Sequence, residues 1–322
     1  MGFTWNMDVA QASEDCAAVL DEISNAVIAD REFLETVLVG AVARGHVLLE
    51  DVPGTGKTLT ARAMASALGL EFSRVQFTPD LLPADVTGTH VFNEETREFE
   101  FQEGPIFANI VLADEINRAP PKTQAALLEA MEEAQVTVDG ETRELPKPFF
   151  VIATQNPVEQ EGTFPLPEAQ VDRFMVKSSI GYPDDEGEVE LLRRRAGRVE
   201  QAPSVGRVLT DDEVADLRQV PEDVRVDEDL LGYMAELTRL TREDGRVDVG
   251  VSPRGTQRLF EASRAYATLV GRDYVTPDDI KRVAHPVLAH RLVLTPDAMV
   301  NNVEKSQVVD AVLESVPVPT VE

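Results

Sequence analysis

The order of apolar and polar positions along the chain predicts two kinds of structure in succession. Up to about residue 180, short apolar runs that suit buried strands alternate with segments in which apolar residues recur at helical spacing. Such alternation is typical of an α/β fold built on a parallel sheet. The predicted strands cover residues 47–50, 72–77, 109–113, 149–154 and 175–180.

Helical patterns dominate the remainder of the chain. We therefore predict an α/β domain over residues 1–183 and a smaller all-α domain over residues 184–322. Capping sequences at Thr210, Ser252 and Thr276 support three of the helices, because an N-cap hydroxyl accepts a hydrogen bond from an otherwise unpaired amide. The residues after about 300 are expected to form a loosely held tail.

Two predicted hairpins interrupt the α/β pattern, one near residues 89–102 and one near residues 135–146. The second turns at Asp139-Gly140, a favoured two-residue hairpin loop. Phenylalanines on the first hairpin are either buried or part of an exposed contact surface, and the pattern leaves both readings open. The second is either a plain edge hairpin or a functional insertion.

The strongest chemical signal follows the first predicted strand, where a glycine-rich turn closes on Gly56-Lys57-Thr58 at the start of a helix. Amides in the first turn of a helix lack partners inside it and carry partial positive charge, so they favour phosphate. Lys57 is placed to reach the β- and γ-phosphates of ATP, and the Thr58 hydroxyl to ligate Mg²⁺. The predicted nucleotide-binding residues are Pro53, Gly54, Thr55, Gly56, Lys57, Thr58 and Leu59.

One position departs from the phosphate-loop pattern, since Asp51 stands where the first glycine is expected. This affects only the expected tightness of the first turn, because the glycines next to Lys57 are retained. The alternative interpretation is a glycine-rich turn that binds no ligand. The flanking strand and helix favour the phosphate loop.

Two carboxylates end the predicted central strand. Ligands of parallel α/β sheets bind at the carboxyl ends of the strands, so Asp114 is placed to hold Mg²⁺ and Glu115 to orient the attacking water. An acidic strand end is weak evidence alone, but it gains weight because it follows a phosphate loop in the same α/β pattern.

Of three further polar residues, Asn156 and Arg254 have two readings each and Arg173 has one. Asn156 follows the next buried strand, where it either hydrogen-bonds the γ-phosphate or simply forms a turn before Pro157. Arg173 is by composition an ordinary ion-pair partner. Arg254 lies in the first turn of a predicted helix, where a cation opposes the helix dipole, so we expect an anionic partner, either a ligand or a carboxylate.

Composition narrows the class of protein. The formal net charge is −28 and the pI about 4.5, with six lysines against 24 arginines, which suggests a halophilic source. Such acidity argues against a large nucleic-acid footprint. Cys16 is the single cysteine. We expect a cytoplasmic protein without membrane insertion, because no apolar run is long enough to span a bilayer and residues 1–15 lack the apolar core of a signal peptide.

Taken together, these motifs resemble AAA+ ATPases and most closely the MoxR family. The resemblance runs from about residue 22 to residue 300, and its carriers occur in order at residues 53–58, 114–118, 153–157, 165–174 and 252–254. It implies an AAA+ αβα nucleotide domain with a five-stranded parallel sheet, followed by an all-α lid domain. It also implies that the two hairpins face a ring pore or a substrate.

The resemblance gives roles to the ambiguous residues. It implies that Asn156 is the γ-phosphate sensor, that Arg173 is an arginine finger acting on ATP of the neighbouring subunit, and that Arg254 is the sensor arginine of the lid. It further implies an ATPase with bound Mg²⁺, assembled as a homo-oligomeric ring, with a hexamer expected, that remodels protein clients or inserts metal cofactors. The usual partner carries a von Willebrand factor A domain.

Two other functions compete with this one. A ring-forming nucleic-acid motor of helicase or initiator type needs basic hairpins, yet Arg97, Arg143 and Lys147 are interleaved with glutamates. An ATP-dependent switch that recruits a partner would use the same site with very slow turnover. The client is not encoded in the ATP machinery, because function on such folds resides in grafted surfaces.

Overall fold

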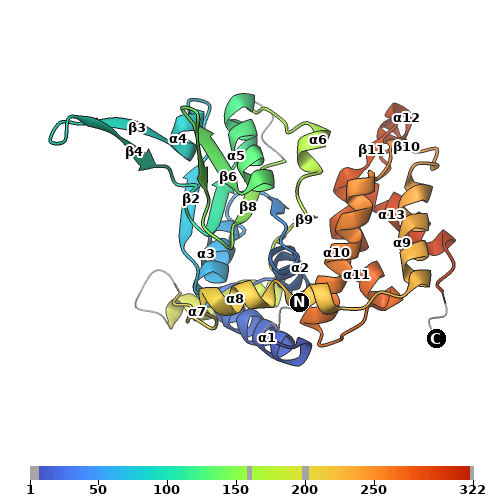
Figure 1. Ribbon diagram of the computed structural model, residues 1–322. Coiled ribbons are helices and arrows are strands. Elements are labelled where there is room, and N and C mark those ends of the chain that lie inside the picture. The colour runs from blue at the N-terminus through green and yellow to red at the C-terminus, as the bar shows by residue number, and fades with distance from the viewer. Residues whose placement is uncertain (1–6, 158–161, 198–202, 320–322) are drawn as a thin grey trace, which may run out of the picture.

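The computed structural model describes residues 7–157, 162–197 and 203–319. Its centre is a five-stranded parallel sheet in the order β2-β5-β8-β1-β9 (Figure 1). This confirms the predicted α/β class, and every predicted strand is present. The strands are β1 (Val47–Glu50), β2 (Phe72–Gln76), β5 (Ile110–Asp114), β8 (Phe150–Gln155) and β9 (Val176–Ser178).

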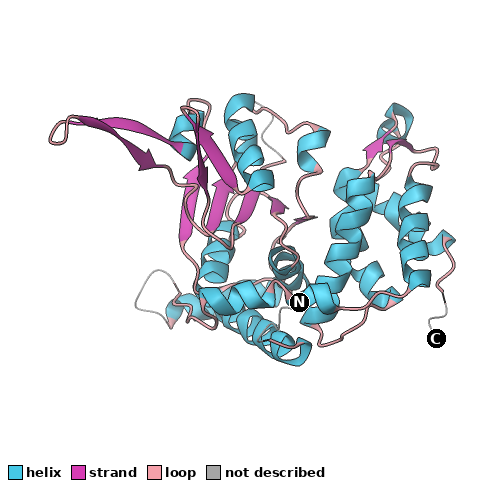
Figure 2. Cartoon of the chain, viewed as in Figure 1, coloured by secondary structure: helices cyan, strands magenta, loops and turns pink. Residues whose placement is uncertain are grey.

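The sheet separates two apolar cores because successive side chains of a strand point to opposite faces. Leu49 packs with α1 (Val9–Ala26), α2 (Arg31–Val42) and α3 (Lys57–Ala67) on one face. Leu48 packs with α5 (Pro121–Glu133) and the short α4 (Pro83–Thr87) on the other. Helices therefore cover both faces (Figure 2), which is the predicted αβα arrangement.

Both predicted hairpins are present. β3 (Gly88–Asn93) pairs with β4 (Glu98–Glu103), and this ribbon extends away from the sheet in Figure 1. Phe92 and Phe99 meet edge to face at its outer end and are 50% and 71% exposed, so these two rings form an exposed surface. β6 (Gln135–Val138) and β7 (Glu141–Glu144) turn at Asp139-Gly140, and both turn residues have positive φ as that turn requires.

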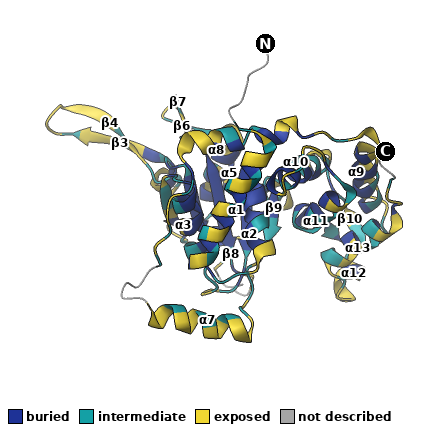
Figure 3. Cartoon of the chain, turned by 90° about the horizontal axis from the view of Figure 1, so that it is seen from below, coloured by how far each residue is buried: buried dark blue, intermediate teal, exposed yellow. Residues whose placement is uncertain are grey.

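Two helices after residue 183 lie against the α/β domain. α8 (Asp211–Leu217) buries Val214 and Leu217, and the chain before it bonds the carbonyl of Ala67 at the end of α3. α7 (Asp185–Ala196) has no buried residue and stands out as exposed in Figure 3. The domain boundary at residues 183/184 stays a prediction.

The last part of the chain forms a helical bundle beside the sheet. Its helices are α9 (Glu228–Thr241), α10 (Pro253–Leu269), α11 (Pro277–Leu288), α12 (Pro296–Val300) and α13 (Lys305–Ser315), with 3-10 turns at Val220–Asp223 and Ala289–Arg291. The bundle also holds a two-stranded ribbon, β10 (Val247–Val249) and β11 (Val293–Leu294), which the all-α prediction omitted.

The prediction of a loose tail after residue 300 is wrong. α13 buries Val308, Val309 and Val312 and packs against α9 and α11, so the segment is a structural part of the bundle. No helix within the described residues is both long enough and apolar enough to cross a membrane.

Candidate active site

The phosphate loop lies between β1 and α3, as predicted. Gly54 and Gly56 have φ values of 90° and 99°, a left-handed conformation that favours glycine, and Gly56 caps α3. No atom of the described residues lies within 4 Å of a Cβ built on either glycine, so the space above the loop is open. The loop therefore fits a phosphate group held on the free amides that begin α3.

Lys57 is largely buried beside this loop. Its Nζ donates to the carbonyl oxygens of Asp51 at 2.6 Å and of Val52 at 3.1 Å. Burial lowers the Lys57 pKa, and the carboxylates of Asp51, Asp114 and Glu115 oppose that shift. The ammonium group thus sits among loop carbonyls and carboxylates at the position where a phosphate would approach.

Asp51, which replaces the first glycine of the phosphate-loop pattern, has a structural role that the sequence pattern did not predict. Its carboxylate accepts hydrogen bonds from the Ser179 hydroxyl at 2.8 Å and from the backbone amides of Ile180 and Gly181 at 2.5 and 3.1 Å. These bonds join the entry of the phosphate loop to the chain after β9. The aspartate in place of glycine therefore fixes the loop instead of loosening it.

Asp114 ends β5 and is held from both sides. One oxygen accepts from the buried Thr154 hydroxyl at 2.7 Å, and the other accepts from the Nε and Nη2 groups of Arg74, at 3.1 and 2.6 Å. Thr154 lies on the neighbouring β8, and Arg74 on β2. With the Thr58 hydroxyl in the first turn of α3, Asp114 supplies the hard oxygen donors that Mg²⁺ takes.

Glu115 has a strained backbone and a fixed side chain. Its φ of 56° is unusual for a residue other than glycine, and its amide donates to Thr154 Oγ1 at 2.8 Å. The carboxylate accepts from the Gln76 amide at 2.7 Å and from Arg118 at 3.1 Å. This network leaves the carboxylate at the carboxyl edge of the sheet, where a water-orienting group belongs.

Asn156 directly follows β8 and is buried, and its carbonyl accepts a hydrogen bond from Asn117 at 3.4 Å. β8 lies between β5 and β1, so Asn156 shares the carboxyl edge of the sheet with Glu115 and the phosphate loop. The position suits the predicted γ-phosphate sensor, and the role stays a prediction.

A cavity of about 290 Å³ adjoins the loop entry. Its lining comes from the α1–α2 connection and from the chain after β9 and includes Ile28, Ile180 and Tyr182. The same segment is bonded to Asp51, so the cavity lies beside the phosphate loop. Val27, by contrast, belongs to the core. The cavity, which has both apolar and polar lining residues, has room for a planar group such as a purine base.

Arg173 and Arg254 lie at the opposite edge of the sheet. They share Glu132 at the end of α5, at distances of 3.3 Å from Arg173 and 2.7 Å from Arg254. His46, just before β1, bonds the Met131 carbonyl at 2.9 Å, which fixes Glu132 near the amino end of β1. The phosphate loop follows the carboxyl end of that strand, roughly 13 Å away for four residues at 3.3 Å each.

The loop that carries Arg173 is held by a buried arginine of the bundle. Arg291 pairs with the Asp172 carboxylate at 2.9 Å and donates to the carbonyls of Asp172 and Phe174 at 3.2 and 2.6 Å. Burial lowers its pKa to about 10, so it stays charged at neutral pH. His290 also approaches the Phe174 carbonyl, at 3.3 Å. The helical bundle thus fixes the backbone on both sides of Arg173.

The sequence pattern did not reveal five residues of this site. Their contacts in this site are with residues that are distant in the sequence. Only Thr154 could have been suspected from the sequence, because it lies at the end of a predicted strand. The five are Arg74, Gln76, Thr154, Glu132 and Arg291.

Two family profiles match the chain. The profile described as the ATPase family associated with various cellular activities (AAA) matches residues 46–176, which include the phosphate loop, the acidic strand end and Arg173. An AAA lid domain profile matches residues 239–312, which include Arg254 and Arg291. Both matches agree with the two parts of the fold described above.

Full-length relatives extend this agreement. The chaperone MoxR1 of Mycobacterium tuberculosis (strain ATCC 25618 / H37Rv) is 42% identical over 309 residues, which are 93% of this chain and 81% of the relative. The uncharacterized protein YeaC of Bacillus subtilis (strain 168) is 48% identical over 93% of each chain. A crystal structure of a presumed ATPase from Cytophaga hutchinsonii superposes with a TM-score of 0.90, at 40% identity over 96% of each chain.

Proposed function

The chain belongs to the MoxR family of AAA+ ATPases, and from this membership we propose that it hydrolyses Mg·ATP at the contacts between subunits of a ring. The observation that carries the proposal is the division of charged groups between two edges of one sheet. Phosphate-binding and water-orienting residues gather at the carboxyl edge. Arg173 and Arg254 gather at the amino edge, a strand length away, so a second subunit is needed to bring the two sets together.

At the carboxyl edge, the amides of the loop and the Lys57 ammonium bind the phosphates. Thr58 and Asp114 would hold Mg²⁺, which when bound would neutralise charge on the phosphate oxygens. Glu115 orients a water for attack, with its carboxylate positioned by Gln76 and Arg118. Asn156, which follows the end of β8, would hydrogen-bond the γ-phosphate.

Arg173 would leave Glu132 and stabilise charge that develops on the γ-phosphate of the neighbouring subunit. A surface ion pair such as Arg173–Glu132 contributes about 1 kcal/mol or less. Arg173 can therefore move from Glu132 to a phosphate with little loss of free energy. An arginine finger supplies about 10³ to 10⁵ in rate in comparable phosphoryl-transfer enzymes, roughly 4 to 7 kcal/mol of barrier. Arg254, on the same carboxylate, would act with it. Hydrolysis would then depend on assembly.

The proposed use of this cycle is remodelling of protein clients or insertion of a metal cofactor into a partner. Relatives named as a chaperone and as MoxR proteins support it at the level of the family. The exposed rings of Phe92 and Phe99 on a protruding hairpin offer an apolar contact for a client. A hexamer and a partner with a von Willebrand factor A domain belong to the same proposal.

Two substitutions test the site. Glu115→Gln should keep ATP affinity within about twofold and reduce turnover by about 10² or more, because the water loses its orienting base. Lys57→Ala should weaken ATP binding by at least about tenfold, because a charge-assisted contact to phosphate is lost. The measurements are calorimetric ATP binding with Mg²⁺ and phosphate release.

Glu129→Gln, on the exposed side of α5, is the matched control and should leave both quantities unchanged. Full turnover by Glu115→Gln would remove that residue from its proposed role. Unchanged ATP affinity in Lys57→Ala would contradict the phosphate-loop assignment.

A further inference from the structure

A second set of cations surrounds two adjoining cavities at the amino edge of the sheet. One cavity, of about 360 Å³, lies between the ends of α2, α5 and α8, and the other, of about 140 Å³, lies between α2 and α10. The two share Arg44 and Arg218. The phosphate loop lines neither of them, because it follows the opposite ends of the strands.

These cavities are positive in a protein with a net charge of −28. Three carboxylates line them, and each already has a cationic partner. Glu132 is bound by Arg173 and Arg254, Glu222 by Arg264 at 3.0 Å, and Glu261 by Arg258 at 2.8 Å. The lining cations are Arg44, Lys147, Arg218, Arg258 and Arg264, which outnumber the lining carboxylates by two, although Lys147 also pairs with Glu144 outside the lining at 2.9 Å.

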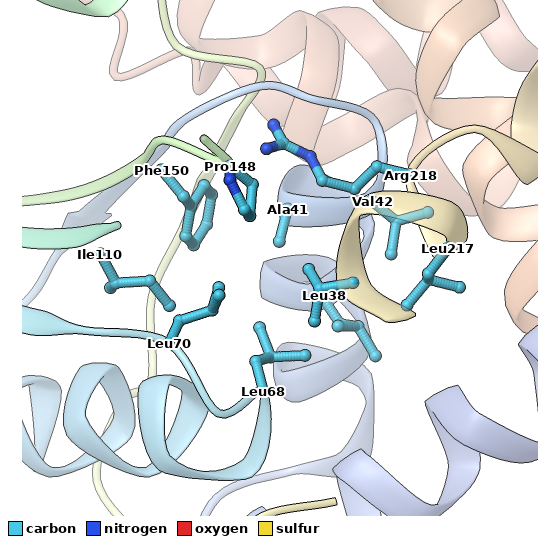
Figure 4. Close-up of a pocket in the computed structure, with 11 residues that line it drawn as sticks. Leu38, Ala41, Val42, Leu68, Leu70, Ile110, Pro148, Phe150, Leu217 and Arg218 are labelled. Atoms are coloured by element: carbon cyan, nitrogen blue, oxygen red, sulfur yellow. The ribbon is translucent and has the colours of Figure 1, made fainter. Parts of the chain in front are cut away.

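Arg218 is the cation that the protein leaves without a partner. No described residue forms an ion pair with its side chain, and its Nε is buried without an acceptor, as is the Nε of Arg258. Figure 4 shows the stem of Arg218 near Val42 and its guanidinium near Pro148, away from Leu38, Leu68 and Leu70. Burial, with a contribution from Arg44, lowers its pKa to about 10, so the group is charged at neutral pH.

The neighbouring imidazole adds no charge. His46 lines the larger cavity, but its Nδ1 accepts from the Val151 amide and its Nε2 donates to the Met131 carbonyl. Burial lowers its pKa to about 4. The positive charge of the cavity is therefore carried by arginine and lysine, which stay protonated across the physiological range.

We propose that this pair of cavities is an oxyanion site in which Arg218, supported by Arg44 and Lys147, binds a phosphate or carboxylate group. Buried charges in proteins are normally paired, and a guanidinium offers a planar fork that matches both oxyanions. The anion has two sources, a free phosphate compound or a carboxylate on a second copy of this chain, which carries 58 acidic residues.

The first arm of the test is a calorimetric titration with inorganic phosphate at constant ionic strength, in the Lys57→Ala background so that the phosphate loop does not contribute. Arg218→Gln should weaken phosphate binding by about tenfold or more, the cost of one charge-assisted hydrogen bond. Arg225→Gln makes the same charge change at an exposed site paired with Asp273 and should bind as the parent does.

Lys147→Gln is a second variant that should fold even if Arg218→Gln does not, because the Lys147 side chain is largely exposed and its loss leaves the core intact. It should weaken binding severalfold. The second arm is sedimentation velocity of the same variants in the absence of phosphate. If the anion is a carboxylate of a second copy, Arg218→Gln should weaken self-association by about tenfold and Arg225→Gln should not.

Either result, weakened phosphate binding or weakened self-association confined to Arg218→Gln and Lys147→Gln, supports the oxyanion site. Equal behaviour of Arg218→Gln and Arg225→Gln in both arms would overturn it. Neither arm measures ATP turnover, and the phosphate arm does not require assembly of a ring, so its outcome is independent of the proposed function.

Discussion

His46 is held in one neutral form by two backbone groups. Its Nε2 donates to the Met131 carbonyl, and its Nδ1 accepts from the Val151 amide at 3.0 Å. Burial of the ring lowers the His46 pKa to about 4, and a second proton on Nδ1 would in addition face the Val151 donor inside the core. The unfolded chain protonates this histidine near pH 6.5.

The free energy of unfolding should therefore fall on acidification. The folded pKa lies below the unfolded one, so the stabilisation is present above about pH 6.5 and is lost between pH 6.5 and 4, by up to about 3 kcal/mol. Urea unfolding at pH 7.5 and 5.5 measures it. His46→Gln should be less stable at pH 7.5 and should lose less on acidification, whereas His285→Gln, at a partly exposed site, should follow the wild type. If His46→Gln lost as much free energy of unfolding as the wild type between pH 7.5 and 5.5, the argument would be contradicted.

Single residues also mark how far the sequence could predict the site. Lys57, Thr58, Asp114 and Glu115 were predicted because each stands at the junction of a strand and a loop, and such junctions are local patterns. Arg74 and Gln76 were not, because their partnership with Asp114 and Glu115 depends on β2 lying beside β5. No local pattern specifies that neighbour relation. Catalytic roles for these residues stay predictions.

At the scale of elements, the bundle and the Arg173 loop are joined by Arg291. The Asp172 carboxylate and the backbone carbonyls of Asp172, Phe174 and Met175 surround this guanidinium. The adjacent Arg173 owes its placement to that fixed backbone. Movement of the bundle relative to the sheet would therefore move Arg173.

Arg291→Met should reduce ATP turnover by about ten- to a hundredfold and leave ATP affinity within about twofold, since misplacing a catalytic group by about 1 Å has that effect. Asp172→Asn, which removes one ion pair, is the milder variant if Arg291→Met folds poorly. Arg272→Met, which breaks an ion pair with Asp279 elsewhere in the bundle, is the control. Normal turnover in both folded variants, Arg291→Met and Asp172→Asn, would remove Arg291 as a positioning residue.

Element prediction succeeded where a full apolar stripe was present and failed where the stripe was short, even where a cap preceded the helix. The sequence pattern did not predict α13, because its buried stripe consists of only three valines, Val308, Val309 and Val312. β-branched residues also have a low helix propensity. Its burial comes from α9 and α11, which are distant in sequence. Tertiary packing decided the outcome there.

At the scale of the whole molecule, the two edges of the sheet carry complementary chemistry. The carboxyl edge holds the phosphate loop and the acidic strand end, and the amino edge holds Arg173, Arg254 and the proposed oxyanion site. Stacking subunits so that one edge meets the other would complete the site. The halophilic origin that the high acidic charge suggests stays a prediction.

Mixing two inactive variants is the most direct test of the central claim, that ATP is hydrolysed at the interface between subunits. Arg173→Ala should bind ATP normally and hydrolyse it about 10³-fold or more slowly, because the charge acting on the neighbour's phosphate is lost. Mixed rings with Glu115→Gln place an intact Arg173 of one subunit against an intact Glu115 of the next. Phosphate release by the mixture should exceed the sum of the separate variants severalfold. A mixture no more active than that sum would contradict hydrolysis at the subunit interface.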